Sequence, residues 1–217
     1  MYRLDRRMKQ KKLEIFLQQV PPHPTPIPHL EQYQTPASIA ADILFTAFHF
    51  QDIKKCHLAD YGCGTGIFAT GAALLGAKKV CAIDIDTRAL QIAQAFAQAH
   101  NLSITFIQSS IEDITKKCDT VIMNPPFGAQ FSNRNTDRIF LLTALKNASV
   151  VYSLHLTKTR PFVKKLVQDL QGTITAEKDY PFPISHQFHF HTKKVVTYPV
   201  TLFRILNRNH KGQNKSH

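Results

Sequence analysis

The chain has 217 residues, enough for one domain with a proper hydrophobic core, and its apolar fraction of 43% is ordinary for a globular protein. No run reaches the roughly 18 apolar residues that a membrane helix needs, and the basic N-terminus carries no apolar segment typical of a secretion signal. Basic residues outnumber acidic ones by six to one in residues 1–12 and by fourteen to four in 120–217, whereas residues 13–119 hold seven against ten. This segregation of a net charge of +12 favours contact with a polyanion over a merely soluble basic surface.

Four cysteines, Cys56, Cys63, Cys81 and Cys118, are scattered along the chain without a Cys-x-x-Cys pair. We expect buried free thiols rather than a metal or redox site, in a cytoplasmic protein. A disulfide between Cys56 and Cys81 stays open, because the two could face each other on adjacent strands.

The first part of the chain predicts two helices on either side of a linker. Residues 3–19 have apolar positions at helical spacing among charged residues, which is typical of an amphipathic helix. The sequence PPHPTPIPH, residues 21–29, has too many prolines for a helix or a central strand and predicts an extended linker. Pro36 then marks a helix start, for which Thr35 would be the N-cap.

From residue 56 onward, strand-like and helix-like segments alternate, which predicts a Rossmann-like, doubly wound α/β sheet of seven mostly parallel strands. The last two strands have no helix between them, so we expect the C-terminal strand to be antiparallel. We assign residues 1–29 to a basic helix and linker, 30–207 to one domain, and 208–217 to a disordered tail. The expected strands are 56–61, 78–86, 103–108, 118–124, 149–154, 172–180 and 193–206, and the expected helices 69–75, 87–100, 136–148 and 158–171.

A glycine-rich loop, DYGCGTG at residues 60–66, follows the first strand and precedes a helix. Glycines at alternate positions let the backbone turn sharply and approach a ligand. Asp84 ends the second strand, 22 residues after Gly62, where a carboxylate can accept two ribose hydroxyls. The combination predicts a nucleotide-like cofactor.

The spacing of this loop narrows the choice of cofactor. It reads G-x-G-x-G, which is neither the dinucleotide fingerprint nor a phosphate-binding loop. The preceding acid, Asp60, suits a cofactor with a cationic amino-acid end. S-adenosylmethionine has such an end, so we expect Asp60 near its ammonium group and Asp84 on its ribose.

A second motif, VIMNPPFG at residues 121–128, ends the fourth strand with an amide, two prolines and an aromatic ring. The prolines stop the strand and stiffen the loop, Asn124 supplies a carbonyl and an amino group, and Phe127 offers a flat apolar face. A proline-rich turn with a buried Phe is the alternative. In a doubly wound sheet the first and fourth strands are neighbours, so the motif would face the glycine loop.

This arrangement resembles amino-group methyltransferases with an Asn/Asp-Pro-Pro-aromatic motif. From Lys11 to Arg204 the ordered motifs LEQYQTP, DYGCGTG, AIDID, VIMNPPFG, NTD, YSLH and FHFHTKK resemble the methyltransferase-like protein five family, which methylates N6 of an adenine in small-subunit ribosomal RNA. The resemblance implies that Asn124, Pro125, Pro126 and Phe127 hold the adenine. It also implies cofactor contacts from Gln32, Thr35, Asp60, Gly62, Gly64, Thr65, Gly66, Asp84, Ile85, Ser110, Ile111 and Asn124.

The chain departs from the family pattern at the end of the third strand, where an acid usually contacts the adenine of the cofactor. Ser110 stands there, with Glu112 and Asp113 as candidate substitutes. The resemblance further implies a partner, a small zinc-binding activator that adds along a sheet edge. Two alternatives stay open: a methyltransferase acting on a protein glutamine or on DNA adenine, and a non-catalytic assembly factor that binds ribosomal RNA.

Several other polar residues have weaker assignments. His155 is either an RNA contact or a structural histidine, and we favour the latter. His186, His189 and His191 alternate along a strand without a nearby Cys or acid, so we expect an RNA-contact segment with Lys193 and Lys194 rather than a metal site. Lys158, Arg160, Lys164 and Lys165 are either a solvated helix face or part of the same basic track.

Overall fold

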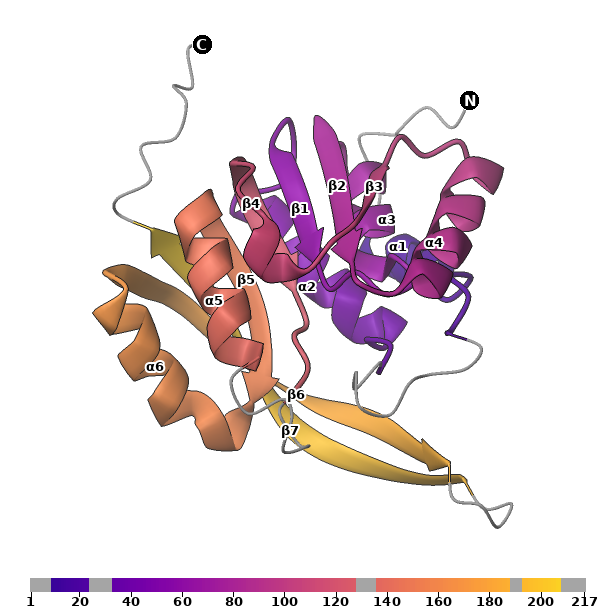
Figure 1. Cartoon of the computed structure of the whole chain (residues 1–217). Helices are drawn as coiled ribbons and strands as arrows, with labels where there is room; N and C mark the ends of the chain where they lie inside the picture. The colour runs from indigo at the N-terminus through magenta and orange to yellow at the C-terminus, as the bar shows by residue number, and fades with distance from the viewer. Residues whose placement is uncertain (1–8, 24–32, 128–135, 188–192, 208–217) are drawn as a thin grey trace.

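The computed structural model describes residues 9–23, 33–127, 136–187 and 193–207 (Figure 1). Its centre is one seven-stranded sheet in the order β3-β2-β1-β4-β5-β7-β6. Strands β1 to β5 are parallel, and β7 is antiparallel to both of its neighbours. The predicted doubly wound sheet with an antiparallel C-terminal strand is thereby confirmed. The strands are β1 (His57–Tyr61), β2 (Lys79–Asp84), β3 (Thr105–Gln108), β4 (Cys118–Met123), β5 (Ala148–Leu156), β6 (Gly172–Gln187) and β7 (Lys193–Asn207).

Helices cover both faces of the sheet, and the sheet separates two clusters of buried core residues (Figure 1). The first cluster joins one face to α1 (Gln10–Leu17), α2 (Ala37–His49), α3 (Ile67–Leu74) and α4 (Thr87–Ala99). The second joins the other face to α5 (Thr136–Asn147) and α6 (Arg160–Asp169). Two short 3-10 helices, η2 (Ile111–Asp113) and η4 (Thr157–Thr159), follow β3 and β5.

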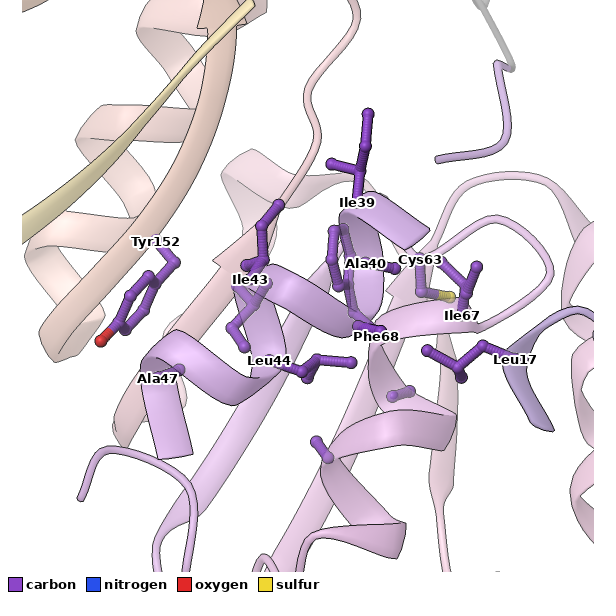
Figure 2. Packing of buried hydrophobic residues seen from close by; sticks show 14 of the residues in the cluster. Leu17, Ile39, Ala40, Ile43, Leu44, Ala47, Cys63, Ile67, Phe68 and Tyr152 are labelled. Atoms are coloured by element: carbon purple, nitrogen blue, oxygen red, sulfur yellow. The ribbon is translucent and has the colours of Figure 1, made fainter. Parts of the chain in front are cut away.

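Apolar periodicity explains how α2 is held in the first cluster. Ile43, Leu44 and Ala47 recur at helical spacing and are fully buried. Figure 2 shows them between Tyr152 of β5 and the residues of α1 and α3, including Leu17. Because only the N-cap residue Pro36 separates Thr35 from α2, this packing also holds Thr35, which lines the cavity described below.

The structure corrects two details of the sequence interpretation, the cap of the second helix and the burial of the cysteines. The first described helix, Gln10–Leu17, lies within the predicted 3–19, and residues 1–8 lie outside the described part. Pro36, not Thr35, occupies the N-cap position of α2, and no side chain caps that helix. The expected free thiols are confirmed at all four cysteines, so no disulfide joins Cys56 and Cys81, but only Cys63 is buried and the other three are half-buried.

Strand β6 extends beyond the predicted 172–180 to Gln187, whereas β7 begins at Lys193 as predicted, and the two strands form a hairpin that extends away from the rest of the sheet (Figure 1). The last pair between β7 and β5 joins Val200 to Leu156. Beyond it, from the pair of Pro181 and Pro199 onward, β7 pairs with β6 alone. In this part of the hairpin, each strand has a neighbouring strand on one side only. A proline is tolerated there, because the N–H group that it lacks is not needed for pairing on the open side.

The linker at 24–32 and the tail at 208–217 lie outside the described residues, as do His189 and His191. Among the described helices, we find none with the length and apolar character to cross a membrane.

Candidate cofactor and substrate site

A cavity of about 280 Å³ opens at the carboxyl ends of β1, β2 and β4, where doubly wound sheets bind ligands. Its walls come from the loop after β1, the end of β2, the turn after β3, the start of the Asn-Pro-Pro-Phe loop, the first two turns of α5, and the segment that precedes α2. The two sequence motifs thus share one cavity, as their strand positions predicted.

The glycine loop has the backbone that its sequence requires. Gly62, Gly64 and Gly66 have φ values of +66°, +52° and +86°, all in the left-handed region. A Cβ on Gly62 would come within 3.1 Å of the Phe140 ring, whereas a Cβ on Gly64 would meet nothing within 4 Å. Gly64 therefore borders open space in the cavity, which leaves room for a ligand to approach its backbone.

Asp84 holds the backbone around the glycine loop, a role that the sequence did not predict. One carboxylate oxygen accepts the N–H of Gly64 at 2.7 Å, and the other accepts the N–H of Asp86 at 2.9 Å. Burial raises the pKa of this carboxyl. Asp84 also lines the cavity, and each of its oxygens has a further lone pair for a ribose hydroxyl. Asp84 therefore holds the glycine loop in place through Gly64 and also lines the cavity.

Asp60 lies beneath the glycine loop and is not among the residues that line the cavity. Its Oδ2 accepts the N–H of Ala69 at 2.8 Å, and its buried Oδ1 has no hydrogen-bond partner in the described part of the chain. Burial raises the pKa of this carboxyl to about 7. Contact between Asp60 and a cofactor ammonium group remains a prediction.

Asn124 is held by a residue far away in the sequence. Its side-chain amide donates to the hydroxyl of Thr35 at 3.1 Å. Its Oδ1 is buried and has no hydrogen-bond partner among the described residues, and the side chain lines the cavity. A buried carbonyl oxygen that no described protein group satisfies is unusual, and it is an acceptor available to an amino group of a ligand.

The two prolines and Phe127 follow Asn124 in the loop, but neither Pro125 nor Phe127 is among the described residues that line the cavity. Pro126 lines the cavity, and Pro125 is buried beside it. Phe127 is half-buried, and its ring meets the ring of Phe182 in β6 edge to face, with centroids 5.5 Å apart and planes at 89°. The ring of Phe127 thus packs on a residue of β6, a contact that no sequence pattern predicted.

The residues at the end of β3 also border the cavity. Ser110, Ile111 and Glu112 line it, and the hydroxyl of Ser110 lies 3.4 Å from the carboxylate of Glu112. Of the two candidate substitutes for the acid that Ser110 replaces, Glu112 lines the cavity and Asp113 does not. Glu112 therefore supplies a carboxylate at this part of the wall. The exposed side chain of Ile85 lines the same cavity.

His23 is a cavity residue that the sequence interpretation missed. Its Nε2 lies 2.9 Å from Oδ2 of Asp86, and each of the two side chains is only 7% exposed. His23 lines the cavity together with Tyr33 and Gln34, and the amide of Gln34 donates to the carbonyl of Val20 at 3.2 Å. A proline-rich stretch carries no pattern that could have predicted this contact.

Of the other predicted cofactor contacts, Thr35, Gly62 and Thr65 line the cavity, Gly66 does not, and Gln32 lies outside the described residues.

The remaining polar residues have mostly structural partners. His155 is buried and bonds to Ser153 at 2.6 Å, and burial lowers its pKa to about 3, so it is a neutral structural histidine. Arg160 and Lys164 pair with acids of β6, whereas Lys158 and Lys165 are exposed. The described residues contain no cluster of three His, Cys, Asp or Glu that could hold a metal.

Comparisons with known proteins agree with this geometry. Residues 37–148 match the family model described as Methyltransferase small domain. The chain is 41% identical to the rRNA N(6)-adenosine-methyltransferase METTL5 of Danio rerio, over 91% of this chain and 99% of that protein. It is 39% identical to an uncharacterised protein of Methanocaldococcus jannaschii, over 91% and 94% of the two chains. A crystal structure of a proposed RNA methyltransferase from Pyrococcus horikoshii has a TM-score of 0.86 and 32% identity, over 93% and 98%.

Proposed function

Because the chain belongs to the methyltransferase-like protein five family and carries a methyltransferase small domain, we propose that it transfers a methyl group from S-adenosylmethionine to N6 of an adenine in small-subunit ribosomal RNA. The observation that supports this most is that Oδ1 of Asn124 has no hydrogen-bond partner among the described residues, while its side chain lines a cavity shared with the glycine loop.

The cavity walls fit the proposed cofactor. Asp84 offers acceptors for two ribose hydroxyls, and open space beside Gly64 admits close approach to the backbone. Ile85 offers an apolar surface for a planar ring, and Ser110 and Glu112 offer polar atoms to its edge. Bound in this way, the cofactor would supply an electrophilic methyl group on a sulfonium.

The chain's own part in the reaction is to position the target nitrogen. The lone pair of an adenine amino group is delocalised into the ring, so the nitrogen is a weak nucleophile. Oδ1 of Asn124 and the carbonyl of Pro125 would accept its two N–H groups and favour a pyramidal nitrogen, while Phe127 stacks on the base. The bound cofactor would supply the methyl group, leaving its bonding electron pair on sulfur, and the amino nitrogen held by these residues would gain the methyl carbon and lose one proton to solvent. Positioning and electrostatics therefore supply most of the catalysis.

The choice of ribosomal RNA rests on the relatives and on charge. The names of the relatives from Danio rerio and Drosophila melanogaster, which match over nearly their whole lengths, state adenosine methylation of rRNA. The excess of basic residues in 1–12 and 120–217 suits a polyanion. Small-subunit specificity, action in the cytoplasm and a small zinc-binding activator are carried over from the family resemblance alone.

A protein-glutamine substrate is the second candidate, because a relative of Methanocaldococcus jannaschii described as a putative protein N5-glutamine methyltransferase is 28% identical over 70% of this chain. That similarity is lower and shorter than the similarity to the adenosine enzymes. The two candidates share the amide-accepting chemistry of Asn124, so a substrate test must separate them.

The test is to incubate the purified chain with labelled S-adenosylmethionine and, separately, small-subunit rRNA, large-subunit rRNA and a glutamine-containing peptide. The RNA is then digested to nucleosides and the labelled product identified. N6-methyladenosine from small-subunit RNA alone is the expected result. Label in the large-subunit RNA would overturn the subunit assignment, and label in the peptide alone would overturn the RNA assignment.

A further inference from the structure

Asn124 and Phe127, three residues apart in one loop, are each supported by a different part of the chain. Asn124 bonds to Thr35, which is followed by Pro36, the N-cap residue of α2. Phe127 packs edge to face on Phe182, which is fully buried in β6. The distance between the amide that would accept the target amino group and the ring that would stack on its base therefore depends on how α2 and β6 are joined.

Asp42 joins these two elements. It projects from α2, and its Oδ2 accepts the hydroxyl of Tyr180 at 2.5 Å and the ammonium group of Lys178 at 2.6 Å, both from β6. The amide of Gln10 in α1 donates to its Oδ1 at 3.2 Å. The side chains of Asp42 and Lys178 are 23% and 51% exposed, and Tyr180 is 8% exposed. Burial opposes the charge on Asp42, but the bonds from Lys178 and Tyr180 outweigh burial and lower its pKa, so it is a carboxylate at neutral pH.

This bond lies where the hairpin leaves the sheet. Tyr180 pairs with Val200, the last residue of β7 that is also paired with β5. Phe182 lies two residues further along, where β7 pairs with β6 alone. Backbone pairing to β5 therefore does not fix the position of Phe182. Its position depends on side-chain packing in the first core cluster and on the contact between Asp42 and Tyr180.

We propose that Asp42, Tyr180 and Phe182 act as a brace between α2 and β6 that positions Phe127 relative to Asn124 and so shapes the pocket for the target base. These are positioning residues, because they act through Phe127 and none of them lines the cofactor cavity. The inference rests on the proposed function, since it assigns the brace to the methyl-accepting base.

Three substitutions test the brace with little change in volume. Tyr180→Phe removes only the hydroxyl, Asp42→Asn removes the charge, and Phe182→Leu removes the ring edge beneath Phe127. Phe203→Leu is the matched control for a fully buried ring, because Phe203 lies in the second core cluster. Asp179→Asn is the matched control for an ionic contact of β6, because Asp179 bonds to Arg160 of α6 and to Thr201 rather than to α2.

Each variant is measured for S-adenosylmethionine affinity by calorimetry and for single-turnover methylation of small-subunit rRNA at saturating cofactor. We expect the three brace variants to keep wild-type cofactor affinity and to lose methylation, on the order of 10-fold for Phe182→Leu, because small displacements of a reacting base are costly. The double variant Asp42→Asn, Tyr180→Phe should lose no more than the worse single variant, because both act through one contact.

The outcomes separate the brace from the proposed function. If wild type methylates the RNA and the brace variants match the two controls, the brace is wrong and the proposed function stands. A brace variant that loses cofactor affinity in parallel with methylation would also overturn it, because the defect would then be general. If wild type transfers no methyl group to RNA, the proposed function is wrong and the brace is wrong with it.

Discussion

The amide nitrogen of Asn124 lies 3.1 Å from the hydroxyl oxygen of Thr35, although 89 residues separate them in the sequence. This contact orients the amide so that its oxygen is left buried and without a partner among the described residues. A hydroxyl just before α2 therefore determines which atom of Asn124 is offered to the ligand. Thr35 would contribute to catalysis through Asn124 as well as through the cavity wall.

Thr35→Val should slow methyl transfer by about fivefold to tenfold, because one hydrogen bond contributes about 1 kcal/mol and the Asn124 amide would be free to rotate. Thr35→Ser keeps the hydroxyl and is the control. Single-turnover rates of the two variants at saturating cofactor make the comparison. Equal rates for both would mean that the hydroxyl does not orient Asn124.

Gly62→Ala should destabilise the fold by roughly 1–3 kcal/mol, because the position has a left-handed φ and the new Cβ would press on the Phe140 ring. Gly64→Ala has the same backbone strain but no steric contact within 4 Å, so it should destabilise less. Urea unfolding of both variants measures the difference. A larger loss for Gly64→Ala would contradict the packing described at the loop.

Asp60 should make stability decrease as the pH rises. Its pKa is raised by burial from 3.8 to about 7, so between these values the unfolded chain ionises while the folded chain stays protonated. Ionisation in the unfolded state alone favours unfolding, and the loss is complete above about pH 7. We therefore expect Asp60→Asn to gain stability over wild type, with a larger gain at about pH 8 than at about pH 4 in urea unfolding. An equal gain at both values would show that Asp60 does not titrate in this range.

His23→Ala should weaken the binding of S-adenosylmethionine, because it removes part of the cavity wall and leaves Asp86 without a bond to that side chain. Calorimetry with the cofactor alone measures the effect without any RNA. His49→Ala, at the end of α2 and remote from the cavity lining, is the control. If both variants bind the cofactor like wild type, the His23 contact is structural only.

The sequence predicted the parts of the site that follow directly from strand ends. The motifs that follow β1 and β4 were expected to lie close together, because those strands are neighbours in a doubly wound sheet. Asp84, at the end of β2, was expected at the same edge of the sheet, and it lines the shared cavity. Local patterns also placed most helices to within a few residues.

The parts that depend on tertiary contacts were missed. Thr35 looked like a helix cap, because a hydroxyl before a helix start is typical of one, yet its hydroxyl bonds to Asn124. His23 and Phe182 lie far in the sequence from both motifs, and no spacing rule connects a linker histidine or a hairpin phenylalanine to a strand end. Asp60 also has a partner that the sequence did not predict, because one of its carboxylate oxygens accepts the N–H of Ala69.

The most direct test of the account is to compare wild type with Asn124→Ala, measuring cofactor affinity and single-turnover methylation of small-subunit rRNA on the same samples. The account predicts N6-methyladenosine from wild type, and a variant that binds S-adenosylmethionine but transfers at least about 100-fold more slowly, as expected when a group that acts in the transition state is removed. A variant that still forms N6-methyladenosine at the wild-type rate would contradict the assignment of Asn124 as the acceptor for the target amino group.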